Sequence, residues 1–291
     1  MTEGLHGAGR YHRGWRARVE QSGNPGRRPE PARPRASASR GTTRAVTSLV
    51  HSHPAFEPWS FDRAALVARG RALHPSYRDA QPYPHVVIDG LLGDARSAAI
   101  ARAFPPPTHP HWKRRDHAEQ RRLGQLQRSA FDGVAIELRW LLAELSGMAF
   151  LDFLGAIAGR RDLIADPHFT GAGPLATLPG GHLAIHTDFN RDSARHLDRV
   201  LTALYYVPTA WDEAWGGELE LWDRARTRCE AKISPVRDRL VVMAHGDDTW
   251  HGHPSPLACP EGNLRAVVAA YFYAARAAPG DDAHAHGAVW A

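Results

Sequence analysis

The chain has 291 residues, of which 43% are hydrophobic and 23% charged, a balance typical of a folded globular protein and not of a disordered or fibrous one. No apolar run reaches the length of a membrane span, and no apolar signal segment follows the N-terminal arginines, so we expect a cytoplasmic protein without a membrane partner. The two cysteines, Cys229 and Cys259, are too few for a disulfide framework and are expected to be reduced thiols.

The net charge of +5 is concentrated at the N-terminus. Residues 1–45 hold ten arginines and three glutamates, a net charge of +7, so the other 246 residues carry a net charge of −2. A nucleic-acid-binding protein needs a basic face on its folded part, so no nucleic-acid partner is expected. Residues 1–50 are rich in Arg, Pro, Gly and Ser, which predicts a disordered tail. A misassigned start codon, with the true start at Val46, is an equally open interpretation.

The first half of the remaining chain has mainly helical patterns. Residues 61–73 have the apolar spacing of a helix, and residues 82–104 predict a short strand, a turn and a second helix. Asp94 is the expected N-cap of that second helix. Residues 112–127 are strongly charged and predict a connection without regular structure.

The pattern changes from helical to β after about Asp162. Residues 131–159 predict one or two helices with a break near Ser146-Gly147. Beyond Asp162, short apolar runs alternate with Gly, Pro and Asp, which indicates several short strands in a sandwich or barrel. The chain is therefore predicted to be an α+β protein, with helices first and a β-rich half after them.

One short stretch, "GGHLAIHTDFN", places a histidine and an aspartate two residues apart on a predicted strand. Because residues i and i+2 of a strand point to the same face, His186 and Asp188 can offer two neighbouring ligands to one metal ion. A third ligand can come from "TWHGHPSP", which contains His251 and His253. Two histidines and one carboxylate form the facial triad typical of non-haem Fe(II) oxygenases.

Six sequence blocks extend this pattern in a fixed order. The chain reads His186-Thr187-Asp188, "RVLTALYYVPTAW", "WGGELELW", "KISPVRDRLVVM", "WHGHPSP" and "RAVVAAYFY". This order resembles the 2-oxoglutarate- and Fe(II)-dependent dioxygenases, specifically their prolyl 4-hydroxylase-like branch. The blocks cover about residues 178–273, and weaker similarity extends back to about residue 83.

The resemblance implies a fold and domain limits. It implies a double-stranded β-helix, or jelly-roll, supported by N-terminal helices. The dioxygenase domain is expected over residues 51–278, with the jelly-roll at about 162–278. Residues 279–291 are rich in small residues and are expected to form a flexible tail, in which His284 and His286 are solvated.

The same resemblance assigns roles to individual residues. His186, Asp188 and His251 match the catalytic iron ligands. Arg265 matches the basic residue that pairs with the distal carboxylate of 2-oxoglutarate, a role that suits the two parallel hydrogen bonds of a guanidinium. The alternative for Arg265 is a salt bridge to an internal Asp or Glu.

Three further assignments depend on weaker matches. Tyr206 and Thr202, four residues apart on one strand face, match positions that help to hold 2-oxoglutarate, although a buried core tyrosine would fit as well. His253 is the alternative third ligand, at a position where the family usually has an apolar residue. Leu178 and Leu183 stand where related enzymes often have tyrosines, so the hydrogen bonds to the cosubstrate are expected to differ.

The implied activity is hydroxylation of an unactivated C–H with release of succinate and CO2. It requires Fe(II), 2-oxoglutarate as cosubstrate and O2, with ascorbate as an optional addition. The expected substrate is a small molecule, an amino acid or a peptidyl residue, including natural-product intermediates. Two alternatives stay open, a nucleic-acid-repair oxygenase on the same fold and a barrel that binds a metal or ligand without turnover.

Overall fold

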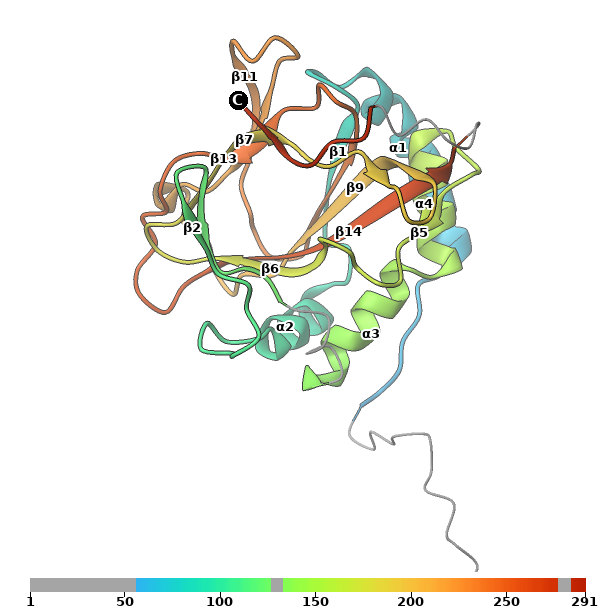
Figure 1. Ribbon diagram of the computed structural model, residues 1–291. Helices are drawn as coiled ribbons and strands as arrows, with labels where there is room; N and C mark the ends of the chain where they lie inside the picture. Colours follow the sequence, from blue (N-terminus) through green and yellow to red (C-terminus); the bar gives the residue numbers. More distant parts are fainter. Residues whose placement is uncertain (1–55, 127–132, 277–283) are drawn as a thin grey trace, which may run out of the picture. The chain divides into compact units, whose positions relative to one another are not determined.

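The computed structural model describes residues 56–126, 133–276 and 284–291 (Figure 1). The predicted disordered tail over residues 1–50 and the alternative start at Val46 lie outside these residues. The four α-helices of the described residues are α1 (Arg63–Asp79), α2 (Asp94–Ala103), α3 (Ile136–Leu145) and α4 (Met148–Ala158).

The helix ends follow local sequence signals, with one correction. Asp62 caps α1 because its side chain accepts a hydrogen bond from the Ala65 amide at 3.0 Å. The predicted break at Ser146-Gly147 is confirmed, since α3 ends before it and α4 begins after it. The prediction of Asp94 as an N-cap was wrong. Gly93 takes that position with a φ of 80°, and Asp94 becomes the first helical residue, where its charge still favours the helix dipole.

The strands form two antiparallel sheets. In spatial order, the large sheet contains β1 (His85–Asp89), β12 (Arg239–Ala244), β9 (Leu197–Tyr206), β14 (Arg265–Ala275), β6 (Gly173–Thr177) and β4 (Gly124–Gln125), with β5 (Ile164–Ala165) beside β14 and β8 (Arg191–Asp192) beside β9. The small sheet contains β11 (Cys229–Ile233), β10 (Leu219–Trp222), β13 (His251–His253), β7 (His182–Thr187), β3 (Gln120–Arg122) and β2 (Arg115–His117), with β15 (Val289–Trp290) along β7.

The order of these strands is that of a jelly-roll. From β6 onward, the chain passes from the large sheet to the small sheet and back several times, and among consecutive strands of the described residues only β8 and β9, and β10 and β11, stay within one sheet. The large sheet places β6, β14, β9 and β12 side by side, and the small sheet places β7, β13, β10 and β11 side by side. The eight strands therefore form the double-stranded β-helix that the sequence predicted.

Alternating side chains on β9 separate two cores. Leu201 and Tyr205 face the helices and join a large apolar cluster that includes Phe150 of α4 and Phe272 of β14. Tyr206 faces the opposite sheet and joins a smaller apolar cluster between the sheets. Figure 1 shows α1 and α4 side by side, away from the small sheet. The helices therefore cover the large sheet and leave the space between the sheets for the site.

Two segments differ from the prediction. Residues 112–127 were expected to be irregular, but β2, β3 and β4 lie within them. Charged strands this short carry no apolar alternation, so the pattern could not indicate them.

The tail over 279–291 was expected to be flexible, but β15 pairs with β7, and the Ala291 amide donates to the Ile185 carbonyl at 2.9 Å. Residues 277–283 of that tail lie outside the described residues.

Within the described part of the chain, no single helix is both long and apolar enough to cross a membrane. The pair α3 and α4 reaches that length and composition only together, across a bend of 47°. Most of their apolar side chains lie in the helix-covered core: Leu138, Leu141, Leu142, Leu145, Phe150, Phe153, Leu154 and Ile157.

Candidate active site

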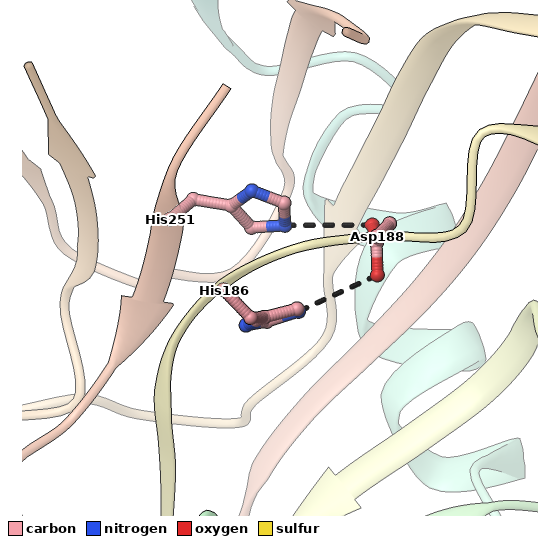
Figure 2. A group of neighbouring side chains, drawn as sticks. All are labelled: His186, Asp188 and His251. Atoms are coloured by element: carbon pink, nitrogen blue, oxygen red, sulfur yellow. Dashed lines mark ion pairs between the residues drawn. The ribbon is translucent and has the colours of Figure 1, made fainter. Parts of the chain in front are cut away.

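Two imidazoles and one carboxylate converge where β7 and β13 lie side by side (Figure 2). His186 on β7, Asp188 just beyond it and His251 on β13 each offer a ligand atom, and these atoms all lie within 4.8 Å of one another. The Nε2 atom of His186 lies 3.4 Å from Asp188 Oδ1, and that of His251 lies 3.5 Å from Asp188 Oδ2. Two nitrogens and one carboxylate at this spacing are suited to a divalent transition metal.

Backbone carbonyls orient both imidazoles. The Nδ1 atom of His186 lies 2.9 Å from the Ala184 carbonyl, and that of His251 lies 2.9 Å from the Thr249 carbonyl. A carbonyl only accepts, so each Nδ1 carries the proton and each Nε2 keeps its lone pair. Both lone pairs then face Asp188, which is the arrangement that a metal-binding histidine requires.

Burial and charge favour the protonation states of a metal site. Burial lowers the pKa of His186, which keeps its imidazole neutral. Burial alone would raise the pKa of Asp188, but the charge of the Arg199 guanidinium holds that pKa well below its usual value. Arg199 donates to Asp188 Oδ2 at 2.8 Å, so the carboxylate stays charged.

Close packing between β7 and β13 brings the two histidines together. A Cβ atom on Gly252 would lie only 2.7 Å from the Ala184 carbonyl oxygen, so no side chain fits between His251 and His253. The pairing register also shifts here, because His251 opposes His186 whereas His253 opposes Leu183. With this extra residue in β7, Leu183 lines the same cavity as His186.

Arg265 lies buried at the other end of the site, with 5% of its surface exposed. Its Nε donates to the Gly217 carbonyl at 2.6 Å, and its Nη2 donates to the Tyr206 hydroxyl at 3.0 Å. The alternative of an internal salt bridge does not hold, since no ion pair of Arg265 occurs among the described residues. The guanidinium is thus available to an anionic ligand.

Gly217 permits this arrangement. It has a φ of 76°, and a Cβ atom there would lie 2.5 Å from the Leu257 side chain and 3.4 Å from the Arg265 side chain. The paired glycines after Trp215 thus allow the backbone to approach Arg265 closely. Burial raises the pKa of Tyr206, so its hydroxyl accepts from Arg265 and keeps a proton to donate.

A cavity of about 270 Å³ joins the two ends of the site. Five of the six predicted site residues line it (His186, Asp188, Thr202, His251 and Arg265), and the sixth, Tyr206, touches Arg265. The Thr202 hydroxyl accepts from Arg199 at 2.8 Å, so it supports Asp188 as well as lining the cavity. His253 also lines the cavity but is not part of the three-residue cluster.

Several residues of the site escaped the sequence analysis. Arg199 opens the block "RVLTALYY", where an arginine beside a mainly apolar run is the signal that could have revealed it. Its guanidinium carbon lies 3.4 Å from the ring centroid of Tyr271, a residue that lines the cavity. Arg115, Gln120 and Arg122 come from the hairpin that was predicted as a connection, and no signal marked them.

The C-terminal segment closes one side of the site. The Trp290 ring lies 5.1 Å from the His186 ring, and Ala288 lines the cavity. His286, predicted to be solvated, instead lies with Nε2 3.0 Å from Asp247 Oδ1, and its amide donates to the Asn190 side chain at 3.1 Å.

A sequence model described as the 2OG-Fe(II) oxygenase superfamily matches residues 174–273, which hold all six predicted site residues. This part of the chain is a 2OG-Fe(II) oxygenase domain. The predicted superfamily is confirmed, and with it the use of Fe(II) and 2-oxoglutarate.

Solved structures similar to this chain include two prolyl hydroxylases. The enzyme from Trichoplax adhaerens, in complex with a hypoxia inducible factor peptide fragment, is 15% identical with a TM-score of 0.46, covering 73% of this chain and 92% of that one. The prolyl-4-hydroxylase from Pseudomonas putida is 19% identical with a TM-score of 0.43, covering 74% and 99%.

A third similar structure is HygX from Streptomyces hygroscopicus, with nickel, 2-oxoglutarate and hygromycin B bound. It is 13% identical with a TM-score of 0.43 and covers 75% of this chain and 95% of that one. None of the curated proteins compared with this chain matches it.

Proposed function

We propose that the protein is a 2-oxoglutarate- and Fe(II)-dependent dioxygenase that hydroxylates an unactivated C–H of an amino acid, a peptidyl residue or a natural-product intermediate. The observation that carries the proposal is one cavity with a three-ligand cluster at one end and a buried, unpaired arginine at the other. A barrel that only binds a ligand does not require both a metal-ligand cluster and a buried arginine in one cavity.

The residues present fit both groups that this reaction needs. His186, Asp188 and His251 would hold Fe(II), because their Nε2 and carboxylate atoms already converge. Arg265 and Tyr206 would hold the distal carboxylate of 2-oxoglutarate, since a guanidinium and a neutral phenol both donate hydrogen bonds to an anion. When bound, the two groups supply oxidative decarboxylation to succinate and CO2 and transfer one oxygen atom of O2 to the substrate.

The chain's own contribution is orientation and exclusion of water. The backbone carbonyls of Ala184 and Thr249 hold the imidazole protons on Nδ1, so that both Nε2 atoms stay free for the metal. Arg199 keeps Asp188 ionised, and Trp290 covers the outer side of His186. Low exposure of all three ligands strengthens these electrostatic contacts.

The presence of Asp188 favours hydroxylation over halogenation. Related enzymes that halogenate have a small residue in place of this carboxylate, which frees a position for halide. A nucleic-acid-repair activity is not favoured, because the residues after 45 carry a net charge of −2.

Anaerobic titration tests the proposal directly. Protein loaded with Fe(II) is titrated with 2-oxoglutarate, and we expect a weak visible charge-transfer band that saturates at one equivalent. The His186→Ala variant should give no band, and Arg265→Gln should shift the titration to higher 2-oxoglutarate concentration. If the wild-type protein gives no band, or if His186→Ala gives the same band, the proposal fails.

A further inference from the structure

Two arginines face each other across the β2–β3 hairpin. Arg115 on β2 pairs directly with Arg122 on β3, and both side chains line the cavity of the site. Like charges directly opposite each other on a strand pair are destabilising. The opposite face of the same hairpin pairs Asp116 with Arg121, whose charges attract at 3.8 Å. The repulsive pair therefore occurs only on the face that lines the cavity.

Neither inward arginine has an acidic partner. Arg122 donates from Nε to the amide oxygen of Gln120 at 2.8 Å, which is a neutral contact, and its other nitrogens are left for a ligand. Across the ranges that the structure describes, neither Arg115 nor Arg122 forms an ion pair. Burial and the nearby cations Arg265 and Arg115 lower the pKa of Arg122, although Tyr271 and Asp188 partly oppose this.

The cavity lining is strongly unbalanced in charge. It contains three guanidiniums, from Arg115, Arg122 and Arg265, and only one carboxylate, from Asp188. The two charges of Fe(II) and the two of 2-oxoglutarate cancel each other, so cosubstrate binding leaves this excess in place. A cavity with such an excess attracts a further anion.

The exposed fraction distinguishes Arg265 from the two arginines of the hairpin. Arg265 is buried at the closed end, Arg122 is half-buried, and Arg115 is exposed. Arg122 and Arg115 therefore lead from the cavity to its mouth, the side from which a primary substrate enters. Arg265 has the inner position that suits a cosubstrate bound first.

We propose that Arg122, assisted by Arg115, binds a carboxylate of the primary substrate, which is therefore a small carboxylic acid such as a free amino acid. The carboxylate meant is the α-carboxylate, so the inference rests on the proposed function and narrows it, because the α-carboxyl group of an internal peptide residue is tied up in a peptide bond. Arg122 is a specificity-determining residue in this role, since a planar guanidinium recognises a carboxylate through two parallel charged hydrogen bonds.

A paired panel of ligands tests the inference. The protein holding Mn(II) and 2-oxoglutarate, without O2, is titrated calorimetrically with the free L-amino acids and with the same compounds as α-carboxamides. We expect one or a few acids to bind and their carboxamides to bind at least about 10-fold more weakly, as for loss of a charged hydrogen bond. The inference is overturned if no acid binds or if the carboxamides bind equally well.

Three variants separate the roles of the arginines. Arg122→Gln and Arg115→Gln should weaken binding of the acid, by about 10- to 100-fold for Arg122, and leave 2-oxoglutarate affinity within about twofold. Arg121→Gln, on the outer face of the same strand, is the matched control and should bind the acid normally. If Arg122→Gln weakens 2-oxoglutarate instead, Arg122 serves the cosubstrate and the inference is wrong. If wild-type protein binds neither Mn(II) nor 2-oxoglutarate, the proposed function itself fails.

Discussion

The two faces of the large sheet have opposite chemistry. The helix-covered face packs fully buried apolar side chains, such as Leu141, Phe150 and Phe153. The face toward the small sheet borders a cavity lined by His186, Asp188 and charged arginines. The helix-covered face uses burial throughout to stabilise the fold, whereas the other face has a smaller apolar cluster and, around the cavity, buried charges that are costly without their ligands. Stability and function are thus divided between the two sides of one sheet.

This division predicts that substitutions on one face change stability and those on the other change activity. Strands β9 and β14 contribute to both faces, because their successive side chains alternate. Variants on either face of the large sheet can therefore test this division between stability and activity. The largest change in activity is expected at the metal cluster.

His186→Ala should lower the 2-oxoglutarate turnover by at least about 1,000-fold, since it removes a group on which the whole reaction depends. The melting temperature of the metal-free protein should hardly change, because the lost imidazole packs against the Trp290 and His251 rings at the site and not against the helix-covered core. Succinate release and a thermal melt measure the two quantities. His182→Ala, at the far end of β7, is the control and should keep full activity. A large loss of stability in His186→Ala would contradict the division between a stabilising face and a functional face of the large sheet.

Phe153→Ala on the opposite face should lower the free energy of unfolding by about 3–5 kcal/mol, the cost of a large cavity in a tight core. Phe153 is fully buried and its backbone carbonyl approaches Gly70 of α1. Urea denaturation of the metal-free protein measures the loss. Met148→Ala on the same helix is the control, because Met148 is 68% exposed. The fraction that stays folded should bind Mn(II) as the wild type does; weaker binding would show that the two faces are coupled.

Arg199→Met should weaken metal binding by about 10- to 100-fold, the usual effect of removing a residue that orients a metal ligand. The Arg199 side chain is fully buried and donates both to Asp188 and to Thr202. Competition with a chelator measures the Mn(II) affinity at a temperature where the variant is folded. Arg195→Met, which removes an arginine that pairs with Asp192 and Asp166 instead, should have wild-type affinity. Equal affinities in both variants would rule out this role for Arg199.

His245 should make stability fall with acidity. Burial lowers its pKa to about 3, with a contribution from Arg199, whereas the unfolded chain binds a proton near 6.5. Unfolding therefore takes up a proton between these values, and the stability of the native state falls as pH drops below 6.5. The expected loss from this residue is about 1.5 kcal/mol between pH 6.5 and 5. Urea denaturation at several pH values should show a flatter dependence for His245→Gln, and parallel curves would contradict the prediction.

Much of the site followed from the sequence for a simple physical reason. The two-residue period of a strand places His186 beside Asp188 and sends Arg265 into the barrel with Val267 and Tyr271, and all of them line the cavity. The jelly-roll followed from the order of six blocks. The domain limits and the roles of individual residues stay predictions.

The rest of the site depends on pairings between distant segments. The hairpin with Arg122 consists of three-residue strands with no apolar period, and β15 has only two residues. The contact of Arg199 with Asp188 and the register shift between β7 and β13 also arise only in the folded molecule. Local periodicity contains no information on such pairings.

The smallest effect is expected at His253, inside the cavity but outside the metal cluster. Its Nδ1 atom has no hydrogen-bond partner among the described residues, and burial holds its pKa well below 6.5. His253→Val should change the Mn(II) affinity by less than about twofold, and removing an unpartnered buried nitrogen should raise the stability by up to about 1 kcal/mol. Chelator competition and urea denaturation measure both. A large loss of metal affinity would instead make His253 a ligand, which the sequence left open as an alternative to His251. The metal end of the cavity would then extend along β13 toward Arg265, and the polar face would hold a wider site than the three-residue cluster.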